Sequence, residues 1–192
     1  MMRMLDIEKE LSERKALLRG HFQLSSGLHS DQYAQCARLF VDTDFAQSLG
    51  VALSSFAPAE ADVVVSPALG GIIIGHEVAR ALSLPFFFAE REASGAMTLR
   101  RGFSLDAGVR ILVVEDVFTT GKSTREVLDL LRSLGGRPVG ALSVIDRGLA
   151  KDALGVPWAS LVRLPLTSWK PEDCPLCKKG LPAVKPGSRP KP

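Results

Sequence analysis

Two acidic residues followed by a run of hydroxyl and glycine residues form the stretch of this sequence with the clearest chemical potential. Glu115 and Asp116 come directly after an apolar run, within the segment VVEDVFTTGKST that ends at Thr124. The second half of this segment resembles the end of an ATP-binding P-loop, but that motif needs a glycine five positions before its Gly-Lys-Ser/Thr. Asp116 occupies that position, so the sequence excludes a P-loop.

The two halves of the segment suit two parts of one ligand. Thr119, Thr120, Ser123 and Thr124 offer hydroxyl groups, Gly121 allows close backbone approach, and the start of a following helix favours an anion. Carboxylates repel a phosphate, but they accept hydrogen bonds from the vicinal hydroxyls of a sugar or bind the water shell of Mg²⁺. The pattern predicts a ribose 5-phosphate site. The alternative is an acidic turn that binds no ligand.

Apolar runs alternate with amphipathic segments along the chain, and these elements must position the acidic pair. We expect strands at 62–66, 84–89, 109–114, 139–145 and, as a fifth candidate, 159–164, and helices at 4–18, 42–56, 72–82 and 123–134. Near-continuous apolar strands that alternate with helices indicate a parallel sheet covered on both faces. Such sheets bind ligands where strands end and helices begin. The acidic pair occupies that place, with a loop expected over 115–122.

The fold class is therefore α/β. We predict one domain over residues 1–170, with a smaller N-terminal elaboration mainly in residues 1–40, where residues 20–36 should form a loop with short strands. Residues 171–192 are rich in Pro and Lys and are predicted to form a C-terminal extension.

The charge distribution argues against a nucleic-acid partner. The net charge is +3, and the last 23 residues carry six Lys or Arg against two acids, so the remaining chain is close to neutral. Nucleic-acid binding rests on clustered Lys and Arg. The start of the chain lacks the apolar core of a secretory signal, no stretch is long enough to span a membrane, and three cysteines suit a reducing compartment. The sequence predicts a cytoplasmic protein that binds neither nucleic acid nor membrane.

At this point VVEDVFTTGKST resembles the phosphoribosyl-diphosphate (PRPP) signature of type I phosphoribosyltransferases. The resemblance implies that family's fold, a parallel sheet flanked by helices with a small N-terminal hood. It also implies that the acids hold the ribose hydroxyls while the following loop holds the 5-phosphate. VVVSPALGGI is similar to the family's diphosphate loop. The PRPP-binding residues so implied are Glu115, Asp116, Thr119, Thr120, Gly121, Lys122, Ser123, Ala68, Leu69 and Gly70.

The base is indicated by GHFQLSSGLHSDQY, residues 20–33, which resembles the N-terminal motif of orotate phosphoribosyltransferases. The matching positions are Phe22, Leu24, Ser26, Gly27, Ser30 and Tyr33. The resemblance covers nearly the whole chain. It implies that orotate is bound by Ser26, Gly27, Tyr33, Thr119 and Arg147. The planar guanidinium of Arg147 suits the carboxylate or carbonyl oxygens of orotate.

The sequence departs from the family pattern at three places. Ser25 and Gly70 stand where many members have Lys. The family's mobile catalytic loop carries several Lys and a His, whereas the corresponding region here carries Arg91, Arg100 and Arg101. The resemblance implies that these arginines stabilise the leaving diphosphate. The alternative is a solvated hairpin with incidental charge.

The reaction implied is transfer of the phosphoribosyl group from PRPP to orotate, which gives orotidine 5′-monophosphate and diphosphate in pyrimidine (UMP) synthesis. The catalytic residues implied are Glu115, Asp116, Arg91, Arg100 and Arg101. The implied cofactor is Mg²⁺ bound mainly through PRPP, and the implied assembly is a homodimer in which loop 90–103 reaches the partner's site. One alternative is a phosphoribosyltransferase for a purine base, which the 20–33 motif disfavours. Another is a PRPP-sensing regulatory protein that binds nucleic acid, which the near-neutral body disfavours.

Cys174 and Cys177 form one metal-type pair. A tetrahedral zinc site needs four ligands. The other candidates in the chain are Cys36, His21, His29 and His76. A dimer could pool two cysteine pairs across its axis, and the alternative is a reduced, partly buried turn. We expect His21 and His29 to lie at the surface or to make hydrogen bonds.

Overall fold

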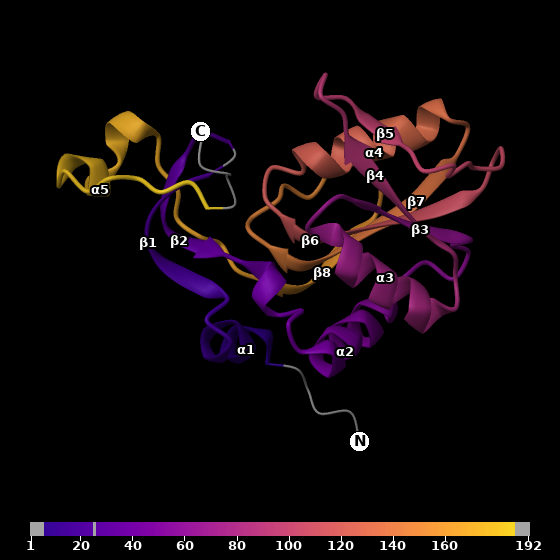
Figure 1. Ribbon diagram of the computed structural model, residues 1–192, viewed down its shortest axis with the longest axis horizontal. Helices are drawn as coiled ribbons and strands as arrows, with labels where there is room; N and C mark the ends of the chain where they lie inside the picture. The colour runs from indigo at the N-terminus through magenta and orange to yellow at the C-terminus, as the bar shows by residue number, and fades with distance from the viewer. Residues whose placement is uncertain (1–5, 25, 187–192) are drawn as a thin grey trace. The chain divides into compact units, whose positions relative to one another are not determined.

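The computed structural model describes residues 6–24 and 26–186, and its internal contacts divide the chain into two units (Figure 1). Unit 1 contains the described residues up to Arg38 together with those from Pro165 onward, and unit 2 contains Leu39–Leu164. These boundaries differ from the predicted division at residue 170, which remains a prediction about domains. In the described ranges, no helix has the length and apolar character that crossing a membrane requires.

Unit 2 is built on a six-stranded sheet. Its strands are β3 (Val63–Pro67), β4 (Phe86–Arg91), β5 (Met97–Leu99), β6 (Arg110–Phe118), β7 (Arg137–Asp146) and β8 (Trp158–Arg163). The spatial order is β5-β4-β3-β6-β7-β8, and all neighbours run parallel except β5, which is antiparallel to β4. The predicted α/β class with a mostly parallel sheet is confirmed.

Helices cover both faces of this sheet (Figure 1). Helices α2 (Thr43–Ser54) and α3 (Gly71–Leu82) lie on one face, and α4 (Lys122–Ser133) lies on the other. The central strands are therefore buried on both sides, as their unbroken β-branched runs predict. Val63, Val64 and Val65 of β3 are all at most 3% exposed. Helix α2 begins where expected, because the side chain of Asp42 accepts a hydrogen bond from the Phe45 amide at 3.1 Å.

Strand β6 is longer than predicted, and this changes the setting of the acidic pair. It continues to Phe118 rather than ending at residue 114, so Glu115 and Asp116 lie within the strand and the loop shrinks to 119–121. The reason is that pairing with β7 persists as far as Phe118 opposite Asp146. The Phe118 side chain is fully buried, so the apolar strand resumes after the acids.

Strand β5 was not among the predicted strands, and it forms a short hairpin with β4. Strands β4 and β5 pair from Ala89 opposite Leu99 to Arg91 opposite Met97. The rings of Phe87 and Phe103 stack at a centroid distance of 4.9 Å. The residues just after the hairpin are therefore packed against β4.

Unit 1 begins with a helix that is shorter than predicted. Helix α1 covers Ile7–Glu13 rather than 4–18, and the expected residues before position 6 lie outside the described ranges. Lys15 adopts a φ of 52°, and the Ala16 amide donates a hydrogen bond to the Leu11 carbonyl at 2.8 Å. This reversal ends the helix, and a strand starts at Leu17.

The rest of unit 1 is a two-stranded antiparallel ribbon joined by the C-terminal segment. Strands β1 (Leu17–Gln23) and β2 (His29–Ala34) pair with each other and are followed by the short helix η1 (Cys36–Arg38). The Val184 amide donates to the His21 carbonyl at 2.8 Å, and Trp169 and His29 exchange two backbone hydrogen bonds of 2.8 Å. Between these contacts lie η2 (Pro171–Asp173) and α5 (Pro175–Lys178). The last part of the chain thus completes a unit begun by the first.

Candidate active site

The predicted phosphate loop lies where the winding of the sheet reverses. From β3 the chain passes through α3 to β4 on one side, and from β6 it passes through α4 to β7 on the other. Because β3 and β6 are neighbours, the loops at their carboxyl ends flank this switch point. Open α/β sheets bind ligands at such a point. The two loops contain residues 68–70 and 119–121, which the sequence assigned to PRPP.

Glu115 faces inward and connects the end of β6 to the start of α4. Its side chain is 9% exposed, and its Oε1 accepts a hydrogen bond of 2.9 Å from the Ser123 hydroxyl. Its Oε2 accepts a second hydrogen bond from the Thr124 hydroxyl. Burial raises the pKa of Glu115 to about 7, the nearby Asp116 charge adds to this rise, and the two hydroxyls oppose it. The carboxyl group therefore changes charge close to neutral pH.

Asp116 points to the opposite side of the strand, as alternation along a strand requires. It is half-buried, and its Oδ1 accepts a hydrogen bond from the Val117 amide at 2.9 Å. Burial raises the pKa of Asp116. A Cβ built on Gly70 would lie 2.7 Å from Asp116 Oδ2. A larger residue at position 70 would therefore require the Asp116 carboxylate to move.

The 68–70 loop presents both backbone and an exposed side chain next to Asp116. The peptide bond between Ala68 and Leu69 is cis. The Leu69 side chain is 83% exposed, and the Ala68 amide donates to the Ala89 carbonyl at 2.8 Å. The loop is thus anchored to β4 while its tip remains accessible.

The 119–121 loop has the features of an anion site. Thr119 and Thr120 are exposed, and Gly121 adopts a φ of 70° at the position that precedes α4. Because Gly121 has no side chain to cap the helix, the first amide groups of α4 remain available to a ligand. Arg125 Nη1 donates to the Thr120 carbonyl at 2.8 Å and to the Ala153 carbonyl at 3.2 Å, which holds the loop in shape.

Arg147 lies beside this loop. Its backbone amide donates a hydrogen bond of 2.8 Å to the Phe118 carbonyl, so the end of β7 adjoins the end of β6. The buried side chain of Asp146 shapes the turn that follows, because its Oδ1 accepts from the amides of Gly148 and Leu149 at 2.8 and 2.7 Å. The structure therefore brings Arg147 into the same region as Thr119 and the acidic pair.

The three arginines of the hairpin differ in their contacts. Arg101 forms a bidentate pair with Glu90, with distances of 2.8 and 2.9 Å, and this contact raises the pKa of Arg101 and lowers that of Glu90. Arg91 donates to Glu126 of α4, whose other oxygen lies 4.0 Å from Lys122 Nζ. Within the described ranges, no hydrogen bond or ion pair holds the Arg100 guanidinium. Arg100 is the arginine of this group most available to an anion.

The base-motif residues belong to unit 1. Ser26 and Gly27 form the turn between β1 and β2, where Gly27 has a φ of 84° and its amide donates to the Leu24 carbonyl at 2.9 Å. Tyr33 is half-buried, with its ring 5.8 Å from that of Phe22. Ser25, the predicted departure from the family pattern, lies outside the described residues.

Two side chains that shape the phosphate loop were missed from the sequence. Arg125 fastens the loop through two carbonyl groups, and Glu126 binds both Arg91 and Lys122. Both residues lie on the first turns of α4, one and two residues after Thr124. The only sequence signal for them is this position, because a charged residue on an exposed helix turn is common in proteins without a ligand.

The two histidines of the base motif are buried. His21 and His29 are each 7% exposed and hydrogen-bonded to each other at 2.8 Å. Of the two expected roles, at the surface or in hydrogen bonds, the structure shows the second, because both rings are buried. Cys174 and Cys177 lie against the same two rings.

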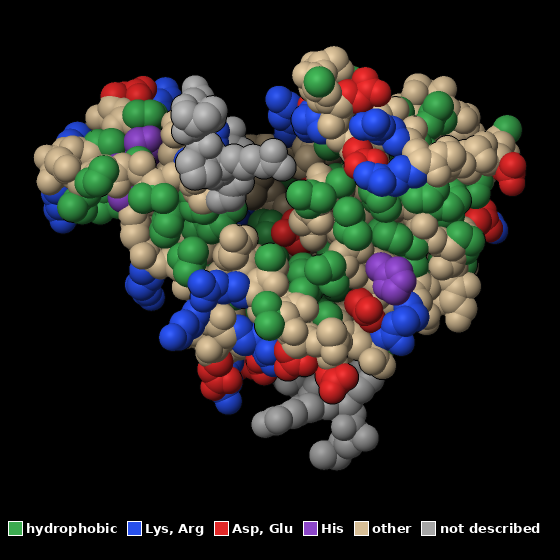
Figure 2. Space-filling view, viewed as in Figure 1, with side chains coloured by type: hydrophobic (Ala, Val, Ile, Leu, Met, Phe, Trp, Pro, Cys, Tyr) green, Lys and Arg blue, Asp and Glu red, His purple; other side chains and the backbone are tan. Residues whose placement is uncertain are grey.

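Charged side chains of both signs are mixed on the face shown in Figure 2, with no single large basic area.

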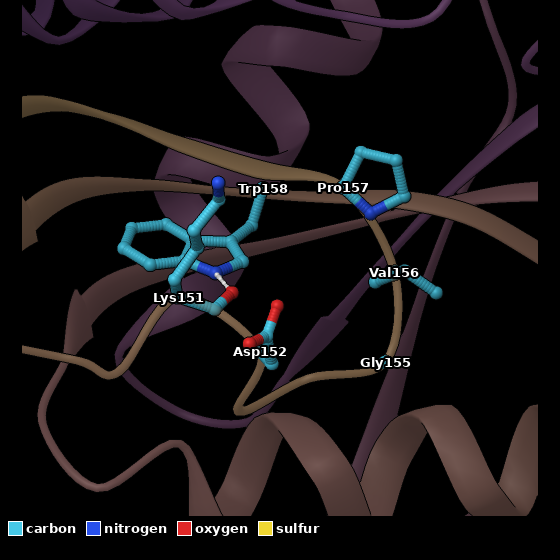
Figure 3. A pocket seen from close by; sticks show the side chains of 6 residues that line it. All are labelled: Lys151, Asp152, Gly155, Val156, Pro157 and Trp158. Carbon is cyan, nitrogen blue, oxygen red and sulfur yellow. Dashed lines mark hydrogen bonds between the residues drawn. The ribbon is translucent and has the colours of Figure 1, made fainter.

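Elsewhere in unit 2, a shallow depression of about 500 Å³ lies where the loop after β7 returns to β8 (Figure 3). Trp158 forms one wall, and its Nε1 donates to the Lys151 carbonyl at 2.8 Å. Neither acid nor any hydroxyl of the 115–124 segment lines this depression, so it is separate from the candidate site.

Comparison with known proteins agrees with this geometry. Residues 49–158 match the family model described as a phosphoribosyl transferase domain. An orotate phosphoribosyltransferase of Carboxydothermus hydrogenoformans is 50% identical over 188 residues, which cover 96% of this chain and 98% of that protein.

Two solved structures are also similar. The crystal structure of orotate phosphoribosyltransferase from Aeropyrum pernix has a TM-score of 0.71 and 32% identity, over 82% of this chain and 93% of that one. The Mycobacterium tuberculosis orotate phosphoribosyltransferase, solved in complex with PRPP, has a TM-score of 0.62 and 26% identity, over 81% and 94% of the two chains. The expected fold, that of the type I phosphoribosyltransferases, is confirmed.

Proposed function

The chain belongs to the orotate phosphoribosyltransferase family, and on that premise we propose that it transfers the phosphoribosyl group of PRPP to orotate. The products are orotidine 5′-monophosphate and diphosphate, in the synthesis of UMP. The observation that carries the proposal is the position of Asp116, whose carboxylate lies against Gly70 of one switch-point loop and within three residues of the other. A ribose 5-phosphate bound there would donate hydrogen bonds from its hydroxyls to the Asp116 carboxylate and accept hydrogen bonds from backbone amides at its phosphate.

The two acids divide the work on the ribose. Asp116 is half-buried and can accept hydrogen bonds from the ribose hydroxyls. Both oxygens of Glu115 already accept hydrogen bonds from hydroxyls of α4, so Glu115 also sets the orientation of the helix start. As the C1′–O bond breaks, positive charge develops on the sugar ring, and carboxylates held in place stabilise that charge.

The 5-phosphate is proposed to bind at the start of α4. The residues involved are Thr119, Thr120, Gly121, Lys122 and Ser123. The uncapped amides of α4 support this assignment, because a helix start attracts an anion and its free amides donate to phosphate oxygens. Arg125 supports it indirectly, because it fixes the backbone of the loop.

The leaving diphosphate is proposed to meet the 68–70 loop and the arginines of the hairpin. Arg91 and Arg101 are paired with carboxylates, so they would have to exchange partners to bind diphosphate. Arg100 makes no such contact in the described ranges and is the arginine we favour. We propose that loop 90–103 serves the site of a partner subunit in a homodimer, as the family resemblance implies.

The residues proposed to bind orotate, as the family resemblance implies, are Ser26, Gly27, Tyr33, Thr119 and Arg147. A guanidinium offers two parallel donors to a carboxylate, which a purine base lacks. The orotate enters as its N1 anion, so no protein nucleophile is required, and the main contributions of the chain are orientation and charge stabilisation.

Mg²⁺ is the cofactor we propose, held mainly by PRPP. The oxygen-only donors at the site fit this ion, which prefers oxygen ligands and retains several waters. Asp116 is the side chain placed to contact it or its waters, because the oxygens of Glu115 are taken by Ser123 and Thr124. When bound, the ion neutralises the charge that builds on the diphosphate.

The proposal places the reaction in the cytoplasm, where three free cysteines are chemically stable. The mixed charge on the face shown in Figure 2 supports a small-molecule enzyme over a nucleic-acid-binding regulator.

One assay tests the function and separates it from both rivals. Protein, Mg²⁺ and PRPP are mixed with orotate or with purine bases, and orotate is followed by its ultraviolet absorbance. We expect orotate to be consumed only when PRPP and Mg²⁺ are both present. Consumption of a purine base instead would select the purine enzyme, and no reaction with any base would reject the proposal.

Arg147→Ala tests the base assignment. Loss of a bidentate charged contact should raise the KM for orotate by about tenfold or more while the KM for PRPP changes little. Arg137→Ala is the matched control, because Arg137 is exposed at the start of the same strand, at the opposite end of the sheet. An equal loss on both substrates would make Arg147 a structural residue.

A further inference from the structure

Four metal-ligand side chains meet inside unit 1. They are His21 of β1, His29 of β2, Cys174 just before α5, and Cys177 within α5. One ligand atom from each lies within 4.8 Å of all the others. Three of the four residues are buried and Cys177 is half-buried. They come from parts of the chain about 150 residues apart, so their meeting is not a consequence of local sequence.

The distances between these atoms are close to those of a tetrahedral zinc site. Zn–S bonds near 2.3 Å and Zn–N bonds near 2.1 Å, at tetrahedral angles, place a sulfur about 3.6 Å from a nitrogen. Cys174 Sγ lies 3.5 Å from His21 Nε2, and Cys177 Sγ lies 3.7 Å from His21 Nε2 and 3.2 Å from His29 Nδ1. The two nitrogens are 2.8 Å apart, so a metal would need to separate them by about 0.6 Å.

The His21 ring is already oriented for this role. Its Nδ1 lies 2.8 Å from the Leu181 carbonyl, which can only accept, so Nδ1 carries the proton. In the neutral ring, Nε2 then carries the lone pair, and Nε2 is the atom that faces the cysteines. Metal-binding histidines characteristically donate their other nitrogen to a carbonyl or carboxylate in this way.

The backbone holds the other ligands in place. Trp169 exchanges two hydrogen bonds with His29, Val184 donates to the His21 carbonyl, and the Lys178 amide donates to the Cys174 carbonyl at 3.1 Å. The segment from 169 to 184 is therefore attached to the ribbon on both sides of the cysteines. This attachment leaves the two thiols facing the two rings.

We propose that His21, His29, Cys174 and Cys177 of one chain bind one Zn²⁺ as a structural site. Two sulfur and two nitrogen ligands in a tetrahedron are a zinc set, and four protein ligands leave no position for a substrate. The ion fastens the C-terminal segment to the β1–β2 ribbon. Units with a small core commonly need such a cross-link, since few apolar side chains are available to stabilise them.

The site also fixes the turn that carries the base motif. His21 lies before this turn and His29 directly after it, so one ion holds both strands that lead into Ser26 and Gly27. This consequence rests on the proposed function, whereas the metal content does not. Zinc bound without any orotate activity would therefore leave the site standing and reject only the function.

The first test is metal analysis of protein that carries no histidine tag, purified under reducing conditions with zinc supplied. We expect about one zinc per chain, and a large fall in Cys177→Ser and in His29→Ala. Cys36→Ala and His76→Ala are the matched controls, since neither residue belongs to the cluster, and both should keep the full content. Less than about one tenth of a zinc per chain in the wild type, or no fall in the cluster variants, would overturn the proposal.

A second measurement uses only the wild type and so survives a variant that fails to fold. Replacement of zinc by Co²⁺ should give the strong visible absorption of a tetrahedral ion and a near-ultraviolet band from sulfur ligation. X-ray absorption should give two sulfur and two nitrogen neighbours for each zinc. A weak octahedral cobalt spectrum, a Cys174–Cys177 disulfide, or one zinc per two chains with four sulfur neighbours would each overturn the proposal.

Discussion

The phosphate turn of unit 2 and the histidine–cysteine cluster of unit 1 present opposite ways of building a site. The first lies within ten consecutive residues, from Glu115 to Thr124, and one strand–helix junction positions all of them. The second joins positions 21 and 29 to positions 174 and 177 through backbone hydrogen bonds between distant segments. A local site is set by one junction, whereas a dispersed site depends on the completed fold. Variants of each site test whether the two sites are independent of each other.

Asp116→Asn should have the largest effect on activity. Removal of one strong charge-stabilising contact typically lowers turnover by about a hundredfold or more. Steady-state kinetics with orotate and PRPP measure the loss, and zinc content should remain unchanged. Asp106→Asn, at an exposed loop position, is the control. Near-normal turnover in Asp116→Asn would remove its assignment to the ribose.

Removal of zinc by a chelator should loosen unit 1 and leave unit 2 intact. Amide hydrogen exchange in β1 and β2 should become about tenfold faster or more, because the ribbon loses its link to the C-terminal segment. Exchange in β3, β6 and β7 should not change. Equal acceleration in both units would show that the ion stabilises the whole chain, and the contrast between the two sites would fail.

Glu115→Gln should change how stability depends on pH. The pKa of Glu115 is raised from its ordinary value of 4.5 to about 7, so the folded protein holds this proton more tightly than the unfolded chain. The free energy of unfolding therefore falls as the pH rises from about 4.5 through 7, and the size of this change is at most a few kcal/mol. Urea unfolding at pH 5 and pH 8 measures it. The Gln variant should lose this part of the pH dependence, and an unaltered dependence would contradict the shift.

Gly121→Ala should have the smallest effect. A positive φ costs a non-glycine residue about 1 kcal/mol, and a Cβ at this position would lie 2.9 Å from Leu154 Cδ2. Gly108→Ala is a matched control, because Gly108 has a φ of 77° and no described atom lies within 4 Å of its Cβ. Thermal unfolding should place Gly121→Ala about 1 kcal/mol below Gly108→Ala, the difference being the steric part. Equal losses of unfolding free energy in the two variants would show that the Leu154 side chain moves away from the added methyl group at little cost.

The sheet and the phosphate turn were predictable because their signals are local. Unbroken apolar runs predicted the parallel strands, and the acids, glycine and hydroxyl residues indicated the ligand that we propose for the turn. The extent of β6 was not predictable. Two adjacent acids after an apolar run indicate a loop, and only the pairing of β6 with β7 keeps Glu115 and Asp116 in the strand. The same holds for the close approach of Gly70, at the start of α3, to the Asp116 carboxylate of β6.

The metal cluster could be predicted only in part. The spacing of Cys174 and Cys177 indicated a ligand pair, but the sequence offered several partners and a pooled site in a dimer. His21 and His29 are eight residues apart, and only the antiparallel turn between them brings their rings together. A pairing of this kind depends on strand register, which a single sequence does not reveal.

The division of unit 1 between the two ends of the chain has a consequence for synthesis on the ribosome. Unit 2 is one continuous stretch, Leu39–Leu164, and can finish folding while the remaining residues are still being added. The β1–β2 ribbon is synthesised before unit 2, yet its outer backbone groups find their partners at Trp169 and Val184 only after unit 2 has been synthesised. During that interval the ribbon presents open strand edges, which are prone to pair with other chains. A nascent chain truncated before Trp169 would therefore keep a complete sheet in unit 2 and carry two unprotected edges at its beginning.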